Sequence, residues 1–374
     1  MGISPNFGFS GSIVELDGIP YFPMGGGFSE VETVEAFKRY QFDICCTQYD
    51  LWPLNHLGRM IREAQGAFVP YIPIDHECVL PPVAKQLHEY TFHAIAMCKY
   101  GEKKIREAGF PHVTTIYHGV DTPVFRPIIE QPKAAFKQNI GWEDDAFVIG
   151  MVQMNKGIRK LIPRQLEIIK AFTDRNPDIK VRVYMHTEPK RDDAFDIPAV
   201  AQFLGLQHIH MPDSYQYFIG FPAEELSCIY NGFDVLLSTS SSEGFGLPIA
   251  EAQSCGVPVV ATDCTSMTEL LEPTPELLVP AQTMEWNQIP ARYWLPDIDK
   301  AVAALERVLN TGPEAYTKKL RDWALKKYDW QTIILPQWIK LMTQLGEDLE
   351  TRCWRIPKPS SLLTALKDEI QVMT

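Results

Sequence analysis

The sequence lacks an excess of positive charge. Its 374 residues include 35 Lys and Arg against 47 Asp and Glu, which gives a formal net charge of −12. Binding to a phosphate backbone depends on clustered Lys and Arg, so this balance argues against a broad nucleic-acid surface. A local basic pocket remains compatible with it.

Cysteine patterns and long apolar runs are missing too. The eight cysteines are scattered, only Cys45 and Cys46 are adjacent, and no pair of Cys-x-x-Cys motifs indicates a zinc site or a disulfide framework. No run of about eighteen apolar residues occurs, and the first residues do not combine a basic region with an apolar stretch. We therefore expect a soluble cytoplasmic protein with reduced thiols, and peripheral membrane contact stays open.

Length and apolar content favour two domains. A chain of 374 residues is too long for one ordinary core, and a hydrophobic fraction of 45% is sufficient for full burial. From residue 43 onward, predicted strands and helices alternate, which is typical of an α/β protein with parallel sheets. We expect one domain over residues 1–127, a second over 128–329, and a terminal helix and tail over 330–374.

The most informative stretch covers residues 234–270. An apolar run at 235–237 predicts a buried parallel strand, and residues 257–262 predict the next one. A loop rich in Ser and Gly leads from the first strand to Pro248, which suits the first position of a helix, and Gly256 suits the position after its end. The pattern predicts a strand, a loop, a helix and a second strand.

The loop of this unit is expected to bind an anion. The backbone N–H groups of Phe245, Gly246 and Leu247 lie at the predicted helix N-terminus, where hydrogen bonding and the helix dipole favour negative charge. Glu243 in the loop and Glu251 in the helix would flank the same ligand. Sugar and ribose hydroxyls explain two acids beside an anion site, because a carboxylate accepts two hydrogen bonds from a vicinal diol. The alternative is an ordinary crossover whose acids are solvent-facing caps.

The segment Glu243-Gly-Phe-Gly-Leu-Pro-Ile-Ala-Glu251-Ala resembles the two-glutamate motif of the retaining glycosyltransferases of family 4. The resemblance extends over most of the chain, from residue 43 to about residue 345. It implies the GT-B fold, an α/β fold with two Rossmann-like domains whose parallel sheets face a central cleft. The first domain would lie on the acceptor side, and the second would bind a nucleotide-sugar donor. Glu251 would bind the ribose diol and Glu243 the sugar.

Basic residues follow the first predicted strand of the second domain, residues 147–153. Lys156, Arg159 and Lys160 come directly after it and should face the loop at 243–247 across the carboxyl edge of the sheet. By resemblance, an Arg and Lys pair of the family maps onto this segment, where fixed cations stabilise a departing nucleotide diphosphate without a metal. Whether Lys156 or Arg159 partners Lys160 is left open, as is a solvated basic turn.

A polar cluster at residues 73–77 follows the predicted strand at 68–72, where open α/β sheets bind ligands. By resemblance, His76 stands where the family often has a histidine that reaches the donor sugar and the acceptor. A loop histidine that caps a helix is the alternative. Residues 118–121 resemble the family's Asn-Gly-Val-Asp turn, with His118 in place of Asn.

Two later segments carry structural expectations. Residues 280–298 have little periodicity, and we expect them to form a long surface loop packed by aromatic side chains. Residues 330–345 predict an amphipathic helix with Trp338 on its face. By resemblance, this helix crosses back to the first domain.

The first domain is expected to be short. Residues 13–22 predict a hairpin, and the chain reaches it directly from Gly11 to Ser12, where the family has a further helix and strand. Without that unit, buried neighbours such as Ile44 and Val69 would face water or a partner. We expect either a break between Gly11 and Ser12 or a homodimer that covers the deficit.

The sequence therefore predicts a retaining glycosyltransferase that needs no metal or other cofactor and uses a nucleotide-diphosphate sugar. Its acceptor, a glycan, a lipid or a small molecule, is not identified. A sugar phosphorylase, a nucleotide-sugar epimerase and a nucleotide-sugar-binding protein without activity remain alternatives, since a fold does not determine a reaction. The catalytic candidates are Glu243, His76 and Lys160, and the donor-binding candidates are Lys156, Arg159, Lys160, Phe245, Gly246, Leu247 and Glu251.

Overall fold

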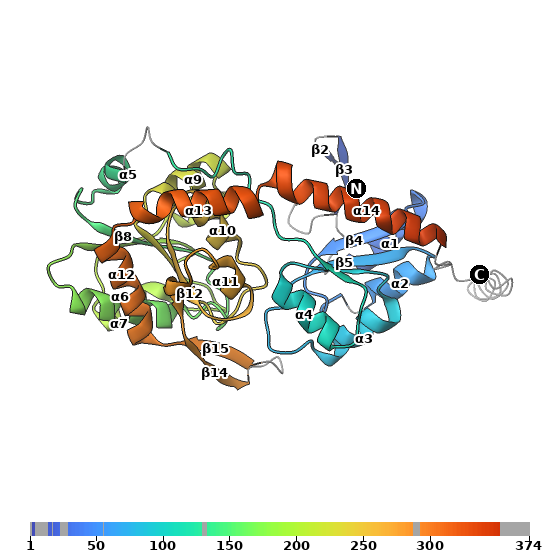
Figure 1. Ribbon diagram of the computed structural model, residues 1–374, viewed down its shortest axis with the longest axis horizontal. Helices are drawn as coiled ribbons and strands as arrows, with labels where there is room; N and C mark the ends of the chain where they lie inside the picture. The colour runs from blue at the N-terminus through green and yellow to red at the C-terminus, as the bar shows by residue number, and fades with distance from the viewer. Residues whose placement is uncertain are drawn as a thin grey trace.

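The computed structural model describes residues 2–3, 14–16, 18–22, 29–54, 56–128, 133–286 and 292–351. Figure 1 shows two α/β bodies that lie side by side, the first blue to teal and the second green to orange. The predicted α/β class with parallel sheets is confirmed. Within the described ranges, no helix is long and apolar enough to cross a membrane.

A parallel sheet with the strand order β4-β5-β6-β7 forms the centre of the first body. Its strands are β4 (Ile44–Gln48), β5 (Ala67–Ile72), β6 (Ala94–Ala96) and β7 (Val113–Thr115). Every residue of β5 is buried, as expected for an apolar strand covered on both faces. The helices of this body are α1 (Glu30–Arg39), α2 (Leu57–Glu63), α3 (Pro81–Tyr90) and α4 (Lys99–Glu107).

The N-terminal strands form a small sheet of their own. They are β1 (Gly2–Ile3), β2 (Val14–Leu16) and β3 (Ile19–Phe22), in the order β1-β3-β2. The antiparallel pairing of β2 with β3 confirms the predicted hairpin. The junction between Gly11 and Ser12 lies outside the described residues.

The second body contains a parallel sheet with the order β10-β9-β8-β11-β12-β13. Its strands are β8 (Phe147–Val152), β9 (Val181–His186), β10 (Ile209–His210), β11 (Val235–Ser238), β12 (Val259–Thr262) and β13 (Leu278–Val279). The strand order reverses between β8 and β11, as in a doubly wound fold. The helices are α5 (Lys133–Ile140), α6 (Ile162–Arg175), α7 (Ile197–Leu204), α8 (Ser214–Ile219), α9 (Ala223–Asn231), α10 (Leu247–Ser254), α11 (Thr265–Leu270), α12 (Ile298–Thr311) and α13 (Glu314–Lys327).

The prediction of a long surface loop at residues 280–298 is wrong. Two antiparallel strands occupy most of this segment, β14 (Ala281–Trp286) and β15 (Arg292–Pro296). The backbone N–H of Trp294 donates to the carbonyl of Ser241 at 3.3 Å, which ties β15 to the loop after β11. Pairing across the hairpin and this tertiary bond stabilise strands whose sequence lacks a clear alternation of apolar and polar residues.

Helix α14 (Leu335–Thr351) lies across the first body, although it follows the helices of the second (Figure 1). At the crossing, the Val120 N–H donates to the carbonyl of Tyr328 at 2.7 Å. The Trp330 N–H donates to the carbonyl of Val120 at 3.0 Å. These two bonds join the end of the first body to the segment that leads into α14.

Helix α14 also covers β5. Val69 is 0% exposed and Ile44 is partly buried, so the expectation that Val69 would face water or a partner is wrong. Val69 and Tyr71 share one face of β5, because side chains alternate along a strand. The ring of Tyr71 meets the ring of Trp338 on α14 edge to face, with the centroids 5.2 Å apart. The crossing helix therefore supplies the cover that the prediction had assigned to a partner.

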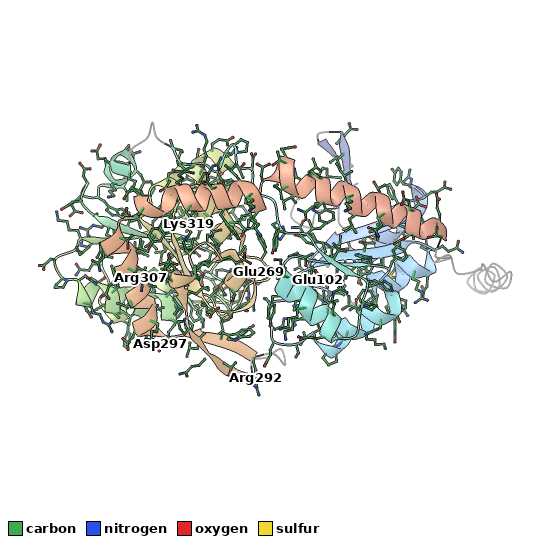
Figure 2. All side chains as sticks on the ribbon, in the orientation of Figure 1. Glu102, Glu269, Arg292, Asp297, Arg307 and Lys319 are labelled. Carbon is green, nitrogen blue, oxygen red and sulfur yellow. The ribbon has the colours of Figure 1, made fainter. Side chains whose placement is uncertain are left out.

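A carboxylate of the second body caps a helix of the first. Glu269 on α11 accepts hydrogen bonds from the backbone N–H groups of Lys99 and Tyr100, both at 3.1 Å, and from the Tyr117 hydroxyl at 2.6 Å. Lys99 and Tyr100 begin α4, where the helix dipole favours a negative charge. Figure 2 shows Glu269 where the two bodies meet.

We expect Trp338→Ala to lower the midpoint of thermal unfolding, measured by circular dichroism. A fully buried aromatic ring costs about 3–5 kcal/mol when truncated to Ala, and the partly buried Trp338 should cost about 2 kcal/mol. The matched control is Ile339→Ala, because Ile339 is the next residue of the same helix and is 59% exposed. Equal shifts in the two variants would contradict the docking of α14 through Trp338.

Candidate functional site

The reversal of strand order places two loops against each other. Residues 153–161 follow β8 and residues 239–246 follow β11, and open α/β sheets bind ligands outside the carboxyl ends of strands at such a point. The backbone N–H and the hydroxyl of Ser241 both donate to the carbonyl of Arg159, at 2.8 and 2.9 Å. The two loops are therefore fixed to each other at the edge of the sheet.

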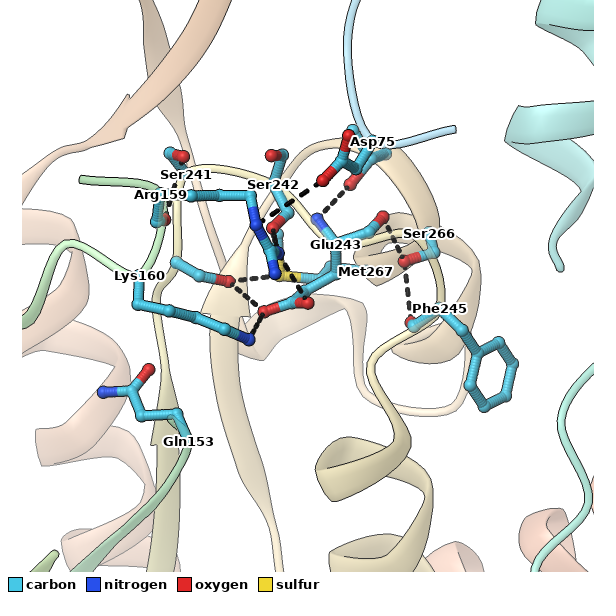
Figure 3. Close-up of polar contacts among 12 residues, drawn as sticks. Asp75, Gln153, Arg159, Lys160, Ser241, Ser242, Glu243, Phe245, Ser266 and Met267 are labelled. Carbon is cyan, nitrogen blue, oxygen red and sulfur yellow. Dashed lines mark hydrogen bonds and ion pairs between the residues drawn. The ribbon is translucent and has the colours of Figure 1, made fainter. Parts of the chain in front are cut away.

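Three charged side chains meet where these loops touch (Figure 3). Lys160 Nζ lies 2.6 Å from Glu243 Oε1, and Arg159 Nη1 lies 2.9 Å from Glu243 Oε2. Arg159 also donates to the carbonyl of Ser242 at 2.7 Å, and the Ser240 hydroxyl donates to Glu243 Oε1 at 2.8 Å. Glu243 is only 8% exposed. Two cations and a hydroxyl thus hold one buried carboxylate.

The Glu243 carboxylate is ionised at neutral pH. Burial alone would raise the pKa of Glu243, but Lys160 and Arg159 outweigh it and lower the pKa to about 2. Burial lowers the pKa of Lys160, although Glu243 acts in the opposite direction. Burial would also lower the pKa of Arg159, but Glu243 and Asp75 raise it above its ordinary value. Of the two cations, Arg159 therefore holds its proton more firmly than Lys160.

The first body contributes an acid and a histidine from the loop after β5. Asp75 Oδ1 lies 2.9 Å from His76 Nδ1, and Asp75 Oδ2 lies 3.5 Å from Arg159 Nε. The Tyr100 hydroxyl donates to the backbone carbonyl of His76 at 2.8 Å. Asp75 thus links His76 to the charged cluster. The sequence analysis placed Asp75 in the polar segment at the sheet edge but did not name it as a site residue. Its position directly before His76 was the one feature of the sequence that could have indicated this role.

Helix α10 presents its N-terminus to the same loops. It begins at Leu247, and no side chain caps it. Pro248 has no N–H and the N–H of Ile249 donates to the carbonyl of Gly246 at 2.9 Å, so among the first three residues of α10 the N–H of Leu247 is the one that remains for a ligand. Gly246, directly before it, has a φ of 98°, a left-handed conformation that favours glycine. The predicted helix is therefore present next to Glu243, and anion binding at its N-terminus stays a prediction.

The motif also joins the two bodies, a task that the sequence did not indicate. A Cβ at Gly244 would lie 2.4 Å from Cβ of Pro73 in the first body, so only glycine fits there. The Phe245 ring lies 5.1 Å from the ring of His118 and 5.8 Å from that of Tyr117, and Figure 3 shows it directed away from the charged residues. Burial lowers the pKa of His118 to about 4, so its ring is neutral in this aromatic contact.

Glu251 has separate surroundings on α10. It accepts a hydrogen bond from the Tyr230 hydroxyl at 2.8 Å. Burial raises the pKa of Glu251 to about 7, and the bond from Tyr230 offsets part of this rise. The pKa values of the two glutamates are therefore shifted in opposite directions, because Glu243 has cationic partners and Glu251 has a neutral one.

Lys156 lies apart from the other two cations. It is exposed, and it forms no ion pair with any residue in the described part of the chain. The sequence left open whether Lys156 or Arg159 partners Lys160. In the structure, Arg159 and Lys160 share Glu243.

Unpaired polar atoms gather where the strands of both sheets end. Within the described ranges, the buried side-chain atoms without a hydrogen-bond partner at these ends are Thr47 Oγ1, His76 Nε2, Gln153 Nε2, His186 Nδ1, Thr187 Oγ1, Thr239 Oγ1 and Ser242 Oγ. An unpaired buried polar group costs about 1–3 kcal/mol, so their concentration at one place fits a ligand rich in hydroxyl and phosphate oxygens. The same described ranges contain no group of three or more His, Cys, Asp and Glu side chains placed to hold a metal ion.

Residues 144–289 match the protein-family model described as Glycosyl transferases group 1. This segment is similar to the glycosyl transferases of group 1. The matched segment contains the two loops at the strand reversal, the charged cluster of Arg159, Lys160 and Glu243, and helix α10.

Curated proteins resemble a part of the chain. Over 158 residues the chain is 30% identical to D-inositol 3-phosphate glycosyltransferase of Arthrobacter sp. (strain FB24), a match that covers 41% of this chain and 35% of that protein. Over 136 residues it is 29% identical to O-antigen chain mannosyltransferase B of Escherichia coli, covering 36% of this chain and 32% of that protein. The chain thus spans about a third of the length of these curated relatives.

Solved structures resemble nearly the whole chain. Sucrose-phosphate synthase from Thermosynechococcus elongatus superposes with a TM-score of 0.69 at 19% identity, covering 90% of this chain and 86% of that one. Anabaena HepE in complex with UDP-glucose superposes with a TM-score of 0.62 at 17% identity, covering 89% and 86%. The predicted GT-B fold is confirmed.

We expect the stability of the protein to depend on pH through Glu251. The folded protein holds this proton up to a pKa of about 7, whereas the unfolded chain releases it near the ordinary value of 4.5. The stability that the neutral acid contributes is complete below the unfolded pKa and is lost as the pH rises through the folded pKa, a loss of up to about 3 kcal/mol.

Glu251→Gln keeps the side chain neutral and should remove this dependence. The difference in unfolding free energy between the variant and the wild type should grow in favour of the variant between about pH 5 and about pH 8. Chemical denaturation at several pH values measures it, and Glu225→Gln, which changes an exposed acid on α9, is the control. A difference that does not change with pH would contradict the raised pKa of Glu251.

Proposed function

We propose that the protein is a retaining glycosyltransferase that moves a sugar from a nucleotide-diphosphate sugar to a hydroxyl-bearing acceptor, which is a glycan, a lipid or a small molecule. The observation that carries this proposal is the meeting of Arg159, Lys160 and Glu243 beside the uncapped N-terminus of α10. The match of residues 144–289 to the group 1 glycosyltransferases supports it. Retention of anomeric configuration is proposed from the resemblance of the two-glutamate motif.

The charges of the cluster suit a diphosphate leaving group. As the bond between the sugar and the diphosphate breaks, negative charge grows on the diphosphate, and preorganised cations and N–H groups stabilise it. Arg159, Lys160 and the N–H groups of Phe245, Gly246 and Leu247, where the loop enters α10, are assigned to this task. These groups supply the counter-charge that a divalent metal would otherwise provide, so we propose donor binding without a metal.

The acids are assigned to hydroxyl groups. Glu251 binds the ribose diol, and Glu243 binds the sugar while it keeps the two cations in place. His76 reaches the donor sugar from the first body. The distance rule of glycosidases does not apply, because these glutamates bind hydroxyls rather than act as an acid and nucleophile pair.

The two bodies divide the substrates in this proposal. Residues 1–127 form the acceptor side, residues 128–329 the donor side, and the segment from 330 onward links them. A cytoplasmic location is proposed as well, because the seven cysteines in the described ranges are all free thiols, as is usual in a reducing compartment.

A panel of nucleotide sugars, followed by released nucleoside diphosphate, tests the function. UDP-glucose is the first donor to try, since it is bound in the similar HepE structure. The anomeric configuration of the product, read by nuclear magnetic resonance, tests retention. Release of sugar phosphate would indicate a phosphorylase, and an isomerised sugar without acceptor would indicate an epimerase. Binding without any turnover would indicate a binding protein.

Donor binding should not depend on divalent metal. In calorimetric titrations, we expect a chelator to change the dissociation constant of the nucleoside diphosphate by less than about twofold, whereas Lys160→Met should weaken binding by about tenfold or more. Lys319→Met is the matched control, because Lys319 is exposed on α13, a helix that contributes no side chain to the charged cluster. Loss of binding on chelation would remove the metal-independent mechanism.

The two glutamates should have separable kinetic effects. We expect Glu251→Gln to raise KM for the donor by about tenfold and Glu243→Gln chiefly to lower kcat, by about a hundredfold, since one acid is assigned to ribose and the other to the reacting sugar. Melting curves must show that Glu243→Gln still folds, because it removes the buried carboxylate that pairs with Lys160 and Arg159. If each substitution changes KM and kcat to the same extent, the assignment of Glu251 to ribose and of Glu243 to the sugar is wrong.

A further inference from the structure

The pair formed by Asp75 and His76 has a defined hydrogen-bond direction. Asp75 Oδ1 lies 2.9 Å from His76 Nδ1, which is hydrogen-bond distance. Burial alone would raise the pKa of Asp75, but the bond to His76 and the charge of Arg159 lower it below its ordinary value. The carboxylate therefore carries no proton at neutral pH and can only accept, so His76 Nδ1 must be the donor.

The second ring nitrogen of His76 lies buried at the carboxyl edge of the sheet. The side chain is 12% exposed, and Nε2 has no hydrogen-bond partner among the described residues. The backbone of His76 is also held in place, because the Tyr100 hydroxyl donates to the His76 carbonyl at 2.8 Å. A neutral imidazole that carries its proton on Nδ1 has an acceptor lone pair on Nε2.

We propose that Asp75 is a positioning residue that keeps His76 in the tautomer protonated on Nδ1, so that Nε2 accepts a hydrogen bond from a hydroxyl of the donor sugar. The inference rests on the proposed glycosyltransferase function. Asp75 does not touch the substrate and acts through the ring of His76. A histidine in the other tautomer would present an N–H to the sugar instead and could not accept this bond.

Asp75 also connects His76 to the donor-binding cations. Its second oxygen lies 3.5 Å from Arg159 Nε, and Arg159 in turn holds Glu243 (Figure 3). Because Asp75 belongs to the first body and Arg159 to the second, this contact forms only when the two bodies are close together. Asp75 thus contacts both His76 and Arg159. An experiment on Asp75 must therefore distinguish an effect on the ring of His76 from an effect on Arg159.

The tautomer can be measured directly in the full-length protein. With ¹⁵N-labelled histidine, long-range proton–nitrogen correlation spectra distinguish a protonated ring nitrogen from an unprotonated one, and His76→Gln identifies the signals of His76 among the nine histidines. We expect Nδ1 to be protonated and Nε2 unprotonated at neutral pH. Asp75→Asn, which can donate as well as accept, should give a mixture of tautomers. A proton on Nε2 of His76 in the wild type would overturn the proposal, whether or not Asp75→Asn folds.

A double-mutant cycle tests the functional part. Asp75→Asn should lower kcat/KM by about tenfold in the wild-type background but by less than about twofold when His76 is already Ala, because its effect passes through that ring. An equal loss in both backgrounds would mean that Asp75 acts through Arg159, and would overturn the proposal. Glu77→Gln is the matched control, since it removes one charge from an exposed side chain two residues further along the loop.

Binding measurements show which part of the donor is involved. Asp75→Asn should weaken binding of the nucleotide sugar, and should leave binding of the nucleoside diphosphate unchanged within about twofold. Equal weakening of both ligands would contradict contact with the sugar. If the wild type binds no nucleotide sugar at all, the proposed function fails, whereas the spectra of His76 still decide whether Asp75 sets the tautomer.

Discussion

One buried carboxylate, held by two cations, organises the candidate site. Burying Glu243 alone would cost several kcal/mol, and Lys160 and Arg159 offset this cost through direct contacts at 2.6 and 2.9 Å. The contacts exist because β8 and β11 are neighbours in the sheet, so the loops that follow them touch. Helix α10 begins directly after the second of these loops, so its N-terminus lies beside Glu243.

The residues of the site also join the two bodies. Arg159 contacts Asp75 of the first body, Gly244 lies against Pro73, and Glu269 caps the first turn of α4. In the proposed function, binding a donor and bringing the bodies together would involve the same side chains. A ligand that engages Arg159 would alter a contact that joins the bodies, and separation of the bodies would remove Asp75 from Arg159.

Local patterns predicted the elements around the site well. The strand at 235–237, the glycine loop and the helix beginning near Pro248 follow from apolar runs and from the positions of Gly and Pro, and the structure contains them. The antiparallel pairing of β14 with β15 was missed because these strands mix aromatic, polar and proline residues without alternation. Pairing partners and the bond to Ser241 stabilise it, and neither is visible in a local pattern.

The sequence by itself determined the α/β class, the two-glutamate segment with Glu251 on its helix, and the edges of the sheets at which Glu243 and His76 lie. Only the tertiary structure decided that Arg159 rather than Lys156 shares Glu243 with Lys160, that Asp75 holds His76, and that Glu251 has the raised pKa. The physical reason is that hydrophobic periodicity reports which residues are buried and along which element they repeat, but not which strands become neighbours. Ion pairs and pKa shifts depend on distances of a few ångströms between residues that are far apart in the chain, and only the packing of the two bodies sets those distances.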